Sequence, residues 1–181
     1  MATVLVPLAQ GCEELEAVTL IDLFRRAGVT VTVAGLEAGP VTASRGVVLL
    51  PETTLEAVLD QDFDLVVLPG GLGGAQRLEA DQRIAALLRR MTEQGRYVAA
   101  ICAAPKVLVS AGLVSGREVT AYPGVLDGQP DIKLSSAAVV RDGTFITSRG
   151  PGTAMDFALS LIEILCGPAK RNEVESALQR S

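Results

Sequence analysis

The stretch Tyr97-Val-Ala-Ala-Ile-Cys-Ala-Ala-Pro-Lys-Val-Leu108 predicts a buried strand, a tight turn and the start of a helix. The apolar run 98–101 suits a strand covered on both faces. Pro105 suits the first turn of a helix, where its missing N–H would have no partner. Cys102 therefore falls on the turn between the two elements. A strand followed at once by a helix is the repeating unit of parallel sheets, so this stretch predicts an α/β fold.

The same alternation runs through the rest of the chain. We expect strands at 4–8, 29–34, 65–68 and 98–101, an excursion of β structure at 41–50 that is broken near 44–46, and short strands at 119, 139–140 and 145–147 with a hairpin turn at 142–143. Helices are expected at 13–27, 81–94, 105–111, 153–167 and 170–178. These repeated units predict a single domain over residues 1–181, with a flavodoxin-like, doubly wound and mostly parallel sheet sandwiched by helices.

Composition narrows the possible functions. The 181 residues are 49% hydrophobic but only 3% aromatic, which fits a core of Val, Leu, Ile and Ala. The net charge is −5 and no basic stripe is present, so we expect no direct binding to nucleic acid or to anionic membranes. No apolar run approaches the roughly 20 residues that span a bilayer. Three cysteines without a framework spacing fit free thiols in the cytoplasm.

The absence of histidine is the strongest restriction. It excludes a Ser-His-Asp triad, a Cys-His dyad and any metal site built on histidine. The sequence also lacks a P-loop and a complete dinucleotide-binding fingerprint. Chemistry must therefore use cysteine, carboxylates, tyrosine, lysine and backbone amides, and we expect neither a metal nor a cofactor.

Sites in open parallel sheets form where strands end and helices begin. Four such junctions contain glycines or turns, and they lie at 10–13, 69–74, 102–105 and 150–153. We expect any functional site at these junctions.

Cys102 is the candidate nucleophile. The amides at a helix N-terminus favour a thiolate, which would lower its pKa below about 8.5. A small buried cysteine closing an apolar strand is the alternative. Cys166 falls in the last turn of a helix, where the dipole disfavours a thiolate, and the role of Cys12 stays open.

Glu16 is the candidate proton donor. A helical projection places it on one stripe with Leu20, Leu23 and Ala27, which is the side facing the core. Burial would raise its pKa from about 4.3 and make it a proton donor near the strand ends. The alternative for Glu16 is a simple acid in the first turn, which stabilises the helix N-terminus. That is the role expected of Glu14. Glu13 could also face the site.

Gly70 and Gly71 follow a predicted strand, so their amides could converge on an anion; a plain turn is the alternative. The segment 149–153 is expected to be scaffold, with Thr153 as a helix N-cap.

Six stretches together resemble the DJ-1/ThiJ/PfpI superfamily, in particular its DJ-1 branch, which includes the bacterial YajL-type chaperones and deglycases. They are Gly11-Cys-Glu-Glu-Leu-Glu16, Arg26-Ala-Gly28 with Val31-Thr-Val-Ala-Gly35, Ser44-Arg45, Val66-Val-Leu-Pro-Gly-Gly71, Ala99-Ala-Ile-Cys-Ala103 and Ser148-Arg-Gly-Pro-Gly-Thr153. They occur in order over nearly the whole chain.

The resemblance implies a flavodoxin-like homodimer, similar to class I glutamine amidotransferases, with Cys102 as nucleophile and a protonated Glu16 as its partner. It places oxyanion-binding amides at Gly71 and Ala103, with Gly70 in the same turn. It also implies supporting roles near the pocket and the dimer interface for Arg26 and Arg45. Tyr122 stands where many relatives carry a histidine, and Ala103 stands where the protease-like branch has one, so proteolysis is not expected.

Two functions are compatible with this resemblance. One is a cysteine-dependent, glutathione-independent glyoxalase or deglycase that acts on methylglyoxal, glyoxal or their early adducts. The other is an oxidative-stress sensor or holdase chaperone that uses oxidation of Cys102 to a sulfinate. A hydratase of the isonitrile type is a lesser option, because that branch carries Asp where this chain has Glu16.

Overall fold

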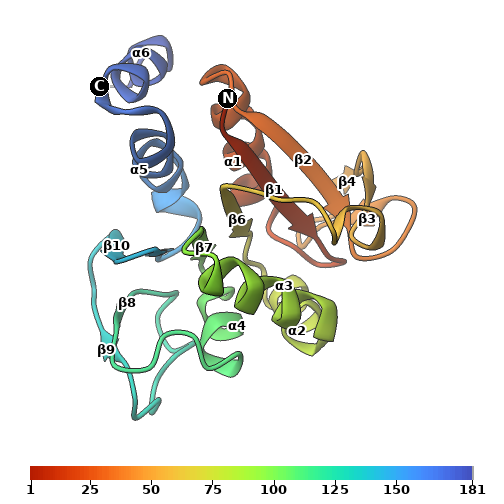
Figure 1. Cartoon of the computed structure of the whole chain (residues 1–181), viewed down its shortest axis with the longest axis vertical. Helices are drawn as coiled ribbons and strands as arrows, with labels where there is room; N and C mark the ends of the chain where they lie inside the picture. Colours follow the sequence, from red (N-terminus) through yellow and green to blue (C-terminus); the bar gives the residue numbers. More distant parts are fainter. Residues whose placement is uncertain (181) are drawn as a thin grey trace.

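The computed structural model describes residues 1–180 and is built on a central sheet of seven strands. The strands are β1 (Thr3–Leu8), β2 (Thr30–Gly35), β5 (Thr53–Thr54), β6 (Leu65–Leu68), β7 (Tyr97–Ile101), β10 (Val139–Asp142) and β11 (Phe145–Ser148). They lie in the order β10-β11-β7-β6-β1-β2-β5, and only the β10–β11 pair is antiparallel (Figure 1). The predicted flavodoxin-like, mostly parallel sheet is confirmed.

Helices cover both faces of this sheet (Figure 1). One face packs against α1 (Glu14–Arg26), α5 (Ala154–Cys166) and α6 (Pro168–Ala177), and the other against α2 (Leu72–Ala80), α3 (Gln82–Glu93) and α4 (Pro105–Ser110). Side chains of β1 alternate between the two cores, with Val4 and Val6 on the α1 side and Leu5 on the α3 side. This alternation follows from the two-residue period of a strand.

Two short two-stranded sheets lie outside the central sheet. The antiparallel pair β3 (Val41–Thr42) and β4 (Val48–Leu49) confirms the predicted excursion and its break, and β8 (Glu118–Val119) pairs with β9 (Lys133–Leu134). The short 3-10 turns η1 (Glu56–Val58) and η2 (Pro151–Thr153) complete the described elements. None of the described helices is both long and apolar enough to cross a membrane.

One helix was not predicted, and one local prediction is wrong. The segment after Gly71 forms the helix α2, although its first turn contains Gly73 and Gly74. Thr153 does not cap α5 through its side chain: its hydroxyl donates to the carbonyl of Gly150 and bonds the hydroxyl of Ser148.

Candidate functional site

The four predicted junctions meet at the carboxyl edge of the sheet around one cavity of about 650 Å³. Each junction contributes to its wall, as does the loop between β3 and β4. The lining residues are Gly11, Glu13, Ser44, Arg45, Gly71, Leu72, Gly73, Cys102, Ala103, Tyr122, Val125 and Pro151. The sequence therefore located this cavity through its glycine-bearing turns.

Cys102 adopts a backbone conformation that side chains rarely accept. Its φ is +65°. Among residues 1–180, the only other non-glycine residue with a positive φ is Gln179. Such a conformation costs on the order of 1–3 kcal/mol and persists only when the surroundings impose it. Here the Cys102 N–H donates to the carbonyl of Ser148 at 3.0 Å, and its carbonyl accepts from the N–H of Tyr122 at 2.9 Å. The turn therefore holds the thiol at the cavity wall, where the residue is 9% exposed.

Gly70 permits the close approach of Cys102 and Glu16. A Cβ atom at this position would lie 2.5 Å from Cβ of Cys102 and 2.7 Å from Oε2 of Glu16. Without that atom, the Gly70 N–H donates to Oε2 of Glu16 at 2.7 Å. The glycine is thus required by packing and is not merely part of a turn.

Glu16 is a buried acid, as its helical stripe predicts. It is 0% exposed, and the other stripe members Leu20, Leu23 and Ala27 are buried too. Burial raises its pKa to about 7, while the Gly70 amide and the Cys102 thiol lower it and the charge of Glu13 raises it. Its Oε1 atom has no hydrogen-bond partner among the described residues, which further disfavours the charged form.

The pKa predicted for Cys102 is wrong in direction. Burial raises the pKa of this thiol to about 12, and the neighbouring charge of Glu16 contributes to the increase. The amides of Gly71 and Ala103 lower it, but they do not outweigh burial. Because the two groups lie side by side, the charge on one raises the pKa of the other, and the two titrations are coupled.

The predicted oxyanion amides lie next to the sulfur. The backbone amides of Gly71 and Ala103 lie close enough to the Cys102 sulfur to lower the pKa of its thiol. Gly71 has a φ of +84°, and a Cβ there would collide with the carbonyl of Gly11. The Gly70 amide serves Glu16 instead. The turn 70–71 therefore contacts both Glu16 and Cys102.

Of the three residues with predicted supporting roles, two line the cavity and one does not. Arg45 and Tyr122 line the cavity, and both are exposed. Arg26 does not line the cavity within its own chain, because it lies at the far end of α1 and pairs with Asp22 at 2.6 Å. A supporting role for Arg26 at a dimer interface stays a prediction.

Glu14 has a role that the sequence did not indicate. It is only 8% exposed, and its carboxylate accepts from the backbone N–H groups of Arg45 and Val47 and from the hydroxyl of Ser44. Desolvation of Glu14 is outweighed by these bonds, so its pKa is lowered. Glu13 also accepts from the Ser44 hydroxyl, at 2.6 Å. Both acids therefore fix the loop that carries Arg45.

Gly150, predicted as scaffold, lies against the site. A Cβ there would lie 3.2 Å from the ring of Tyr122 and 4.0 Å from Sγ of Cys102. Close packing against an aromatic ring has no signature in the sequence around 149–153, so this contact could not be predicted.

The other two cysteines differ from Cys102. Burial raises the pKa of Cys12 to about 11, and its side chain lies in the core beside Gly74. Cys166 is exposed at the end of α5, and its pKa is raised by desolvation. Residues 1–180 contain no group of three or more Cys, Asp or Glu side chains that could hold a metal ion.

Comparisons with known proteins fit this geometry. The model of the DJ-1/PfpI family matches residues 2–164. The chain is 46% identical to Protein dj-1beta of Drosophila melanogaster over 180 residues, covering 96% of this chain and 95% of that protein. It is 36% identical to a Caenorhabditis elegans protein named glutathione-independent glyoxalase DJR-1.2 over 175 residues, covering 96% and 92% of the two chains.

The fold agrees equally well with a solved structure. The crystal structure of Drosophila melanogaster DJ-1beta superposes with a TM-score of 0.96 at 45% sequence identity, covering 99% of this chain and 98% of that one.

Proposed function

The chain belongs to the DJ-1/PfpI family, and from this premise we propose that it is a DJ-1-type stress protein that converts methylglyoxal and glyoxal without glutathione. The observation that carries the proposal is the pairing of the Cys102 thiol with the buried carboxyl of Glu16 at the wall of an open cavity. The name of the Caenorhabditis elegans relative supports the same reaction class.

The pair explains how a thiol with a raised pKa can react. Glu16, with a pKa of about 7, accepts the thiol proton as sulfur bonds the aldehyde carbon of methylglyoxal. Glu16 then gives this proton to the developing alkoxide, which completes the hemithioacetal and returns Glu16 to the carboxylate form. We propose that the amides of Gly71 and Ala103, which lower the pKa of the thiol, also stabilise the negative charge on the alkoxide oxygen.

The remaining steps move two protons and add one water. Glu16 removes the proton from the carbon bonded to sulfur as a second group gives a proton to the neighbouring ketone oxygen, which forms an enediol. Glu16 then returns its proton to the adjacent carbon, while the hydroxyl on the carbon bonded to sulfur gives its proton back to the second group. This leaves a thioester of lactate on Cys102. Hydrolysis of the carbon–sulfur bond releases lactate, or glycolate from glyoxal, and regenerates the thiol. Tyr122, the aromatic hydroxyl in the lining, is the second proton donor that we propose.

The cavity has room for larger substrates than methylglyoxal. Its volume of about 650 Å³ lies within the range of roughly 300–1,000 Å³ typical of ligand pockets. We therefore include early methylglyoxal adducts among the proposed substrates, which would make the protein a deglycase.

Oxidation of Cys102 is the second candidate function. Two molecules of peroxide would each transfer one oxygen to the sulfur and leave as water, which gives a sulfinate. The unpartnered Oε1 of Glu16, when protonated, could donate to a sulfinate oxygen, while the amides of Gly71 and Ala103 hold its charge. In this role the protein would be a sensor or holdase of the YajL type, in the cytoplasm.

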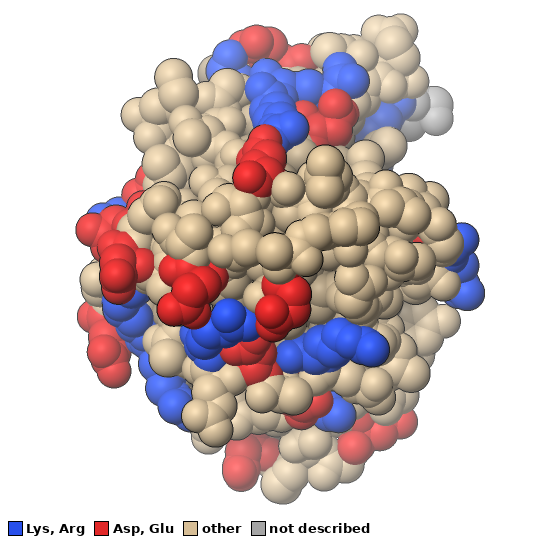
Figure 2. Space-filling view, turned by 90° about the vertical axis from the view of Figure 1, so that its right-hand side faces the viewer, with Lys and Arg blue, Asp and Glu red and all other residues tan. Residues whose placement is uncertain are grey.

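We also propose a homodimer. Leu15 and Val18 on α1 are 51% and 47% exposed, and Val48 on β4 is 62% exposed. The two elements are linked by the hydrogen bond from the Val47 N–H to Glu14. Figure 2 shows acidic and basic side chains interspersed with wide uncharged areas on one face of the molecule. Pairing of two copies through α1 would cover these apolar side chains.

One experiment separates the two functions. Purified wild type, Cys102→Ser and the control Cys166→Ser are assayed for lactate formation from methylglyoxal without glutathione, and their intact masses are measured after mild peroxide. We expect lactate from wild type and Cys166→Ser but none from Cys102→Ser. Wild type that makes no lactate, or Cys102→Ser that makes it equally fast, contradicts the enzymatic proposal. If the enzymatic proposal fails in this way and peroxide adds two oxygens to Cys102, the oxidation sensor remains as the proposed function.

A further inference from the structure

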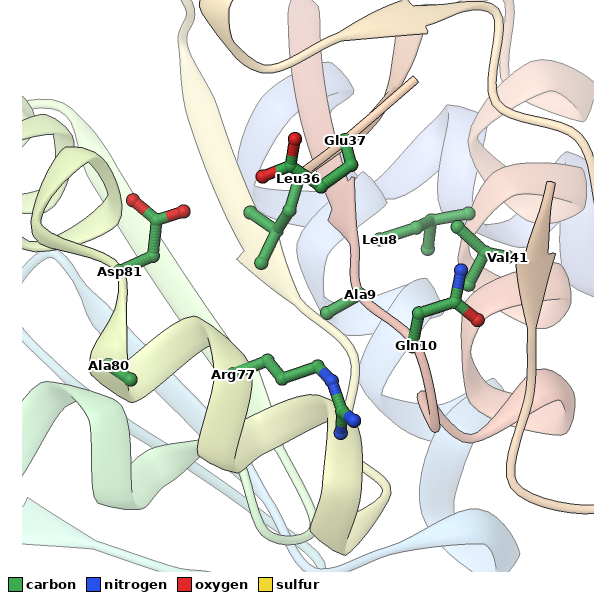
Figure 3. A pocket seen from close by; sticks show the side chains of 9 residues that line it. All are labelled: Leu8, Ala9, Gln10, Leu36, Glu37, Val41, Arg77, Ala80 and Asp81. Atoms are coloured by element: carbon green, nitrogen blue, oxygen red, sulfur yellow. The ribbon is translucent and has the colours of Figure 1, made fainter. Parts of the chain in front are cut away.

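A second cavity lies at the same edge of the sheet, beside α2 and the carboxyl ends of β1 and β2 (Figure 3). Its volume is about 330 Å³, at the lower end of the range of roughly 300–1,000 Å³ for ligand pockets. Its apolar wall comes from four residues that are at most 9% exposed: Leu8, Ala9, Leu36 and Val41. Carboxyl ends of parallel strands are the usual place for ligands in this class of fold.

The rim of this cavity carries one cation without an acidic partner. Asp81 and Glu37 are both engaged by Arg83, whose guanidinium lies 2.7 Å from Oδ2 of Asp81 and 3.5 Å from Oε1 of Glu37. Arg77, by contrast, has no carboxylate within 4.0 Å in the part of the chain that the structure describes. Its Nη1 donates to the carbonyl of Gly73 at 3.1 Å, and its other N–H groups remain for a ligand.

The opposite rim is fixed by Gln10. Its Nε2 donates to the carbonyl of Pro40 at 2.9 Å, and its Oε1 accepts from the N–H of Thr42 at 2.8 Å. These bonds tie the loop after β1 to the start of β3. In Figure 3 the Arg77 side chain extends from α2 toward this loop. The cavity is therefore formed before any ligand binds, which lowers the entropic cost of binding.

We propose that this cavity binds a small monocarboxylate with a short aliphatic chain. The carboxylate pairs with the planar guanidinium of Arg77, and the chain lies on the apolar wall. A dianion such as inorganic phosphate is disfavoured, because the carboxylates of Glu37 and Asp81 at the same rim repel a second negative charge. The proposal does not depend on the reaction at Cys102.

Pentanoate is a suitable probe, and its binding is followed through backbone amide shifts in two-dimensional NMR spectra of the ¹⁵N-labelled full chain. We expect saturable shifts at residues 8–10, 36–37 and 77–81. Arg77→Gln should weaken binding about tenfold or more, because a charge-assisted pair is lost. Arg89→Gln, which changes an exposed arginine on α3, should bind like wild type. Pentanamide, which has the same shape without the charge, should bind more weakly than pentanoate.

Several results would overturn the proposal. These are the absence of saturable shifts, equal binding by Arg77→Gln, equal binding of pentanamide, tighter binding of inorganic phosphate, or shifts centred on the loops around Cys102. A thermal melt checks that Arg77→Gln is folded. If that variant melts early, the comparison of pentanoate with pentanamide in wild type decides the question.

Discussion

The helices α1 and α3 cover opposite faces of the same sheet and are nearly equal in length, with 13 and 12 residues. In α3 the buried side chains are all apolar: Ile84, Leu87, Leu88 and Met91. In α1 the buried set includes the acids Glu14 and Glu16, whereas Leu15 and Val18 are about half exposed.

This contrast separates scaffold from site. In α3, hydrophobicity alone explains which side chain is buried, so its role is to pack. In α1, each exception has a specific neighbour: Glu16 meets Cys102, and Glu14 holds the loop at Arg45. Positions where burial opposes hydrophobicity are where proteins give up stability for function.

The largest expected effect is on turnover and comes from α1. Glu16→Gln removes the group that we propose to move protons, so lactate formation from methylglyoxal should fall about 10²- to 10⁴-fold. The matched control on α3 is Glu93→Gln at an exposed position, which should retain wild-type rates. Equal rates in Glu16→Gln and wild type would remove Glu16 from the mechanism.

The second effect is on stability and comes from α3. Leu88 is fully buried, so Leu88→Ala should lower the free energy of unfolding by about 2–5 kcal/mol. Urea unfolding measures this, and turnover per folded molecule should not change. Leu15→Ala on α1 should cost much less, because Leu15 is 51% exposed. An equal loss for the two variants would show that α1 packs like α3.

The third effect appears in the pH dependence of stability. The folded-state pKa of Glu16 is raised from 4.5 to about 7, so between these values the folded chain holds a proton that the unfolded chain has lost. The stabilisation that protonated Glu16 gives the folded state is fully present below pH 4.5, and it is lost as the pH rises through about 7. At about 1.36 kcal/mol per pH unit, wild type should lose roughly 3 kcal/mol relative to Glu16→Gln. Parallel curves of unfolding free energy for the two proteins would contradict the raised pKa.

The sequence predicted the features that depend on local pattern. Strand runs such as 65–68 and the helical stripe of Glu16 follow from hydrophobic periodicity, and both are observed. The order of the βα units determined the edge at which the site lies. The helix α2 was missed because Gly73 and Gly74 are poor helix formers, and tertiary packing against Cys12 overrides that preference.

Other features depend on distant contacts and could not be predicted. Glu14 was expected to be a simple first-turn acid of its helix, but it accepts hydrogen bonds from the Ser44 hydroxyl and from the loop that follows it, about 30 positions along the chain. Whether the pKa of Cys102 is raised or lowered depends on how deeply the thiol is buried and on the proximity of Glu16. The helix N-terminus is visible in the sequence, but the desolvation that outweighs it is not.

The smallest expected effect on the fold concerns the exposed apolar side of α1. Val18→Lys changes a half-exposed residue, so the free energy of unfolding of a single chain should shift by less than about 0.5 kcal/mol. If two copies pair through α1, the lysine places a charge in the interface, and light scattering should show the mass falling from two chains to one of 18.8 kDa. Leu134→Lys, at a similarly exposed residue on β9, should leave the mass unchanged. Wild type that is already a single chain at micromolar concentration would contradict the dimer. The exposure of Leu15 and Val18 would then have no partner to explain it, and the contrast between α1 and α3 would rest on the buried acids alone.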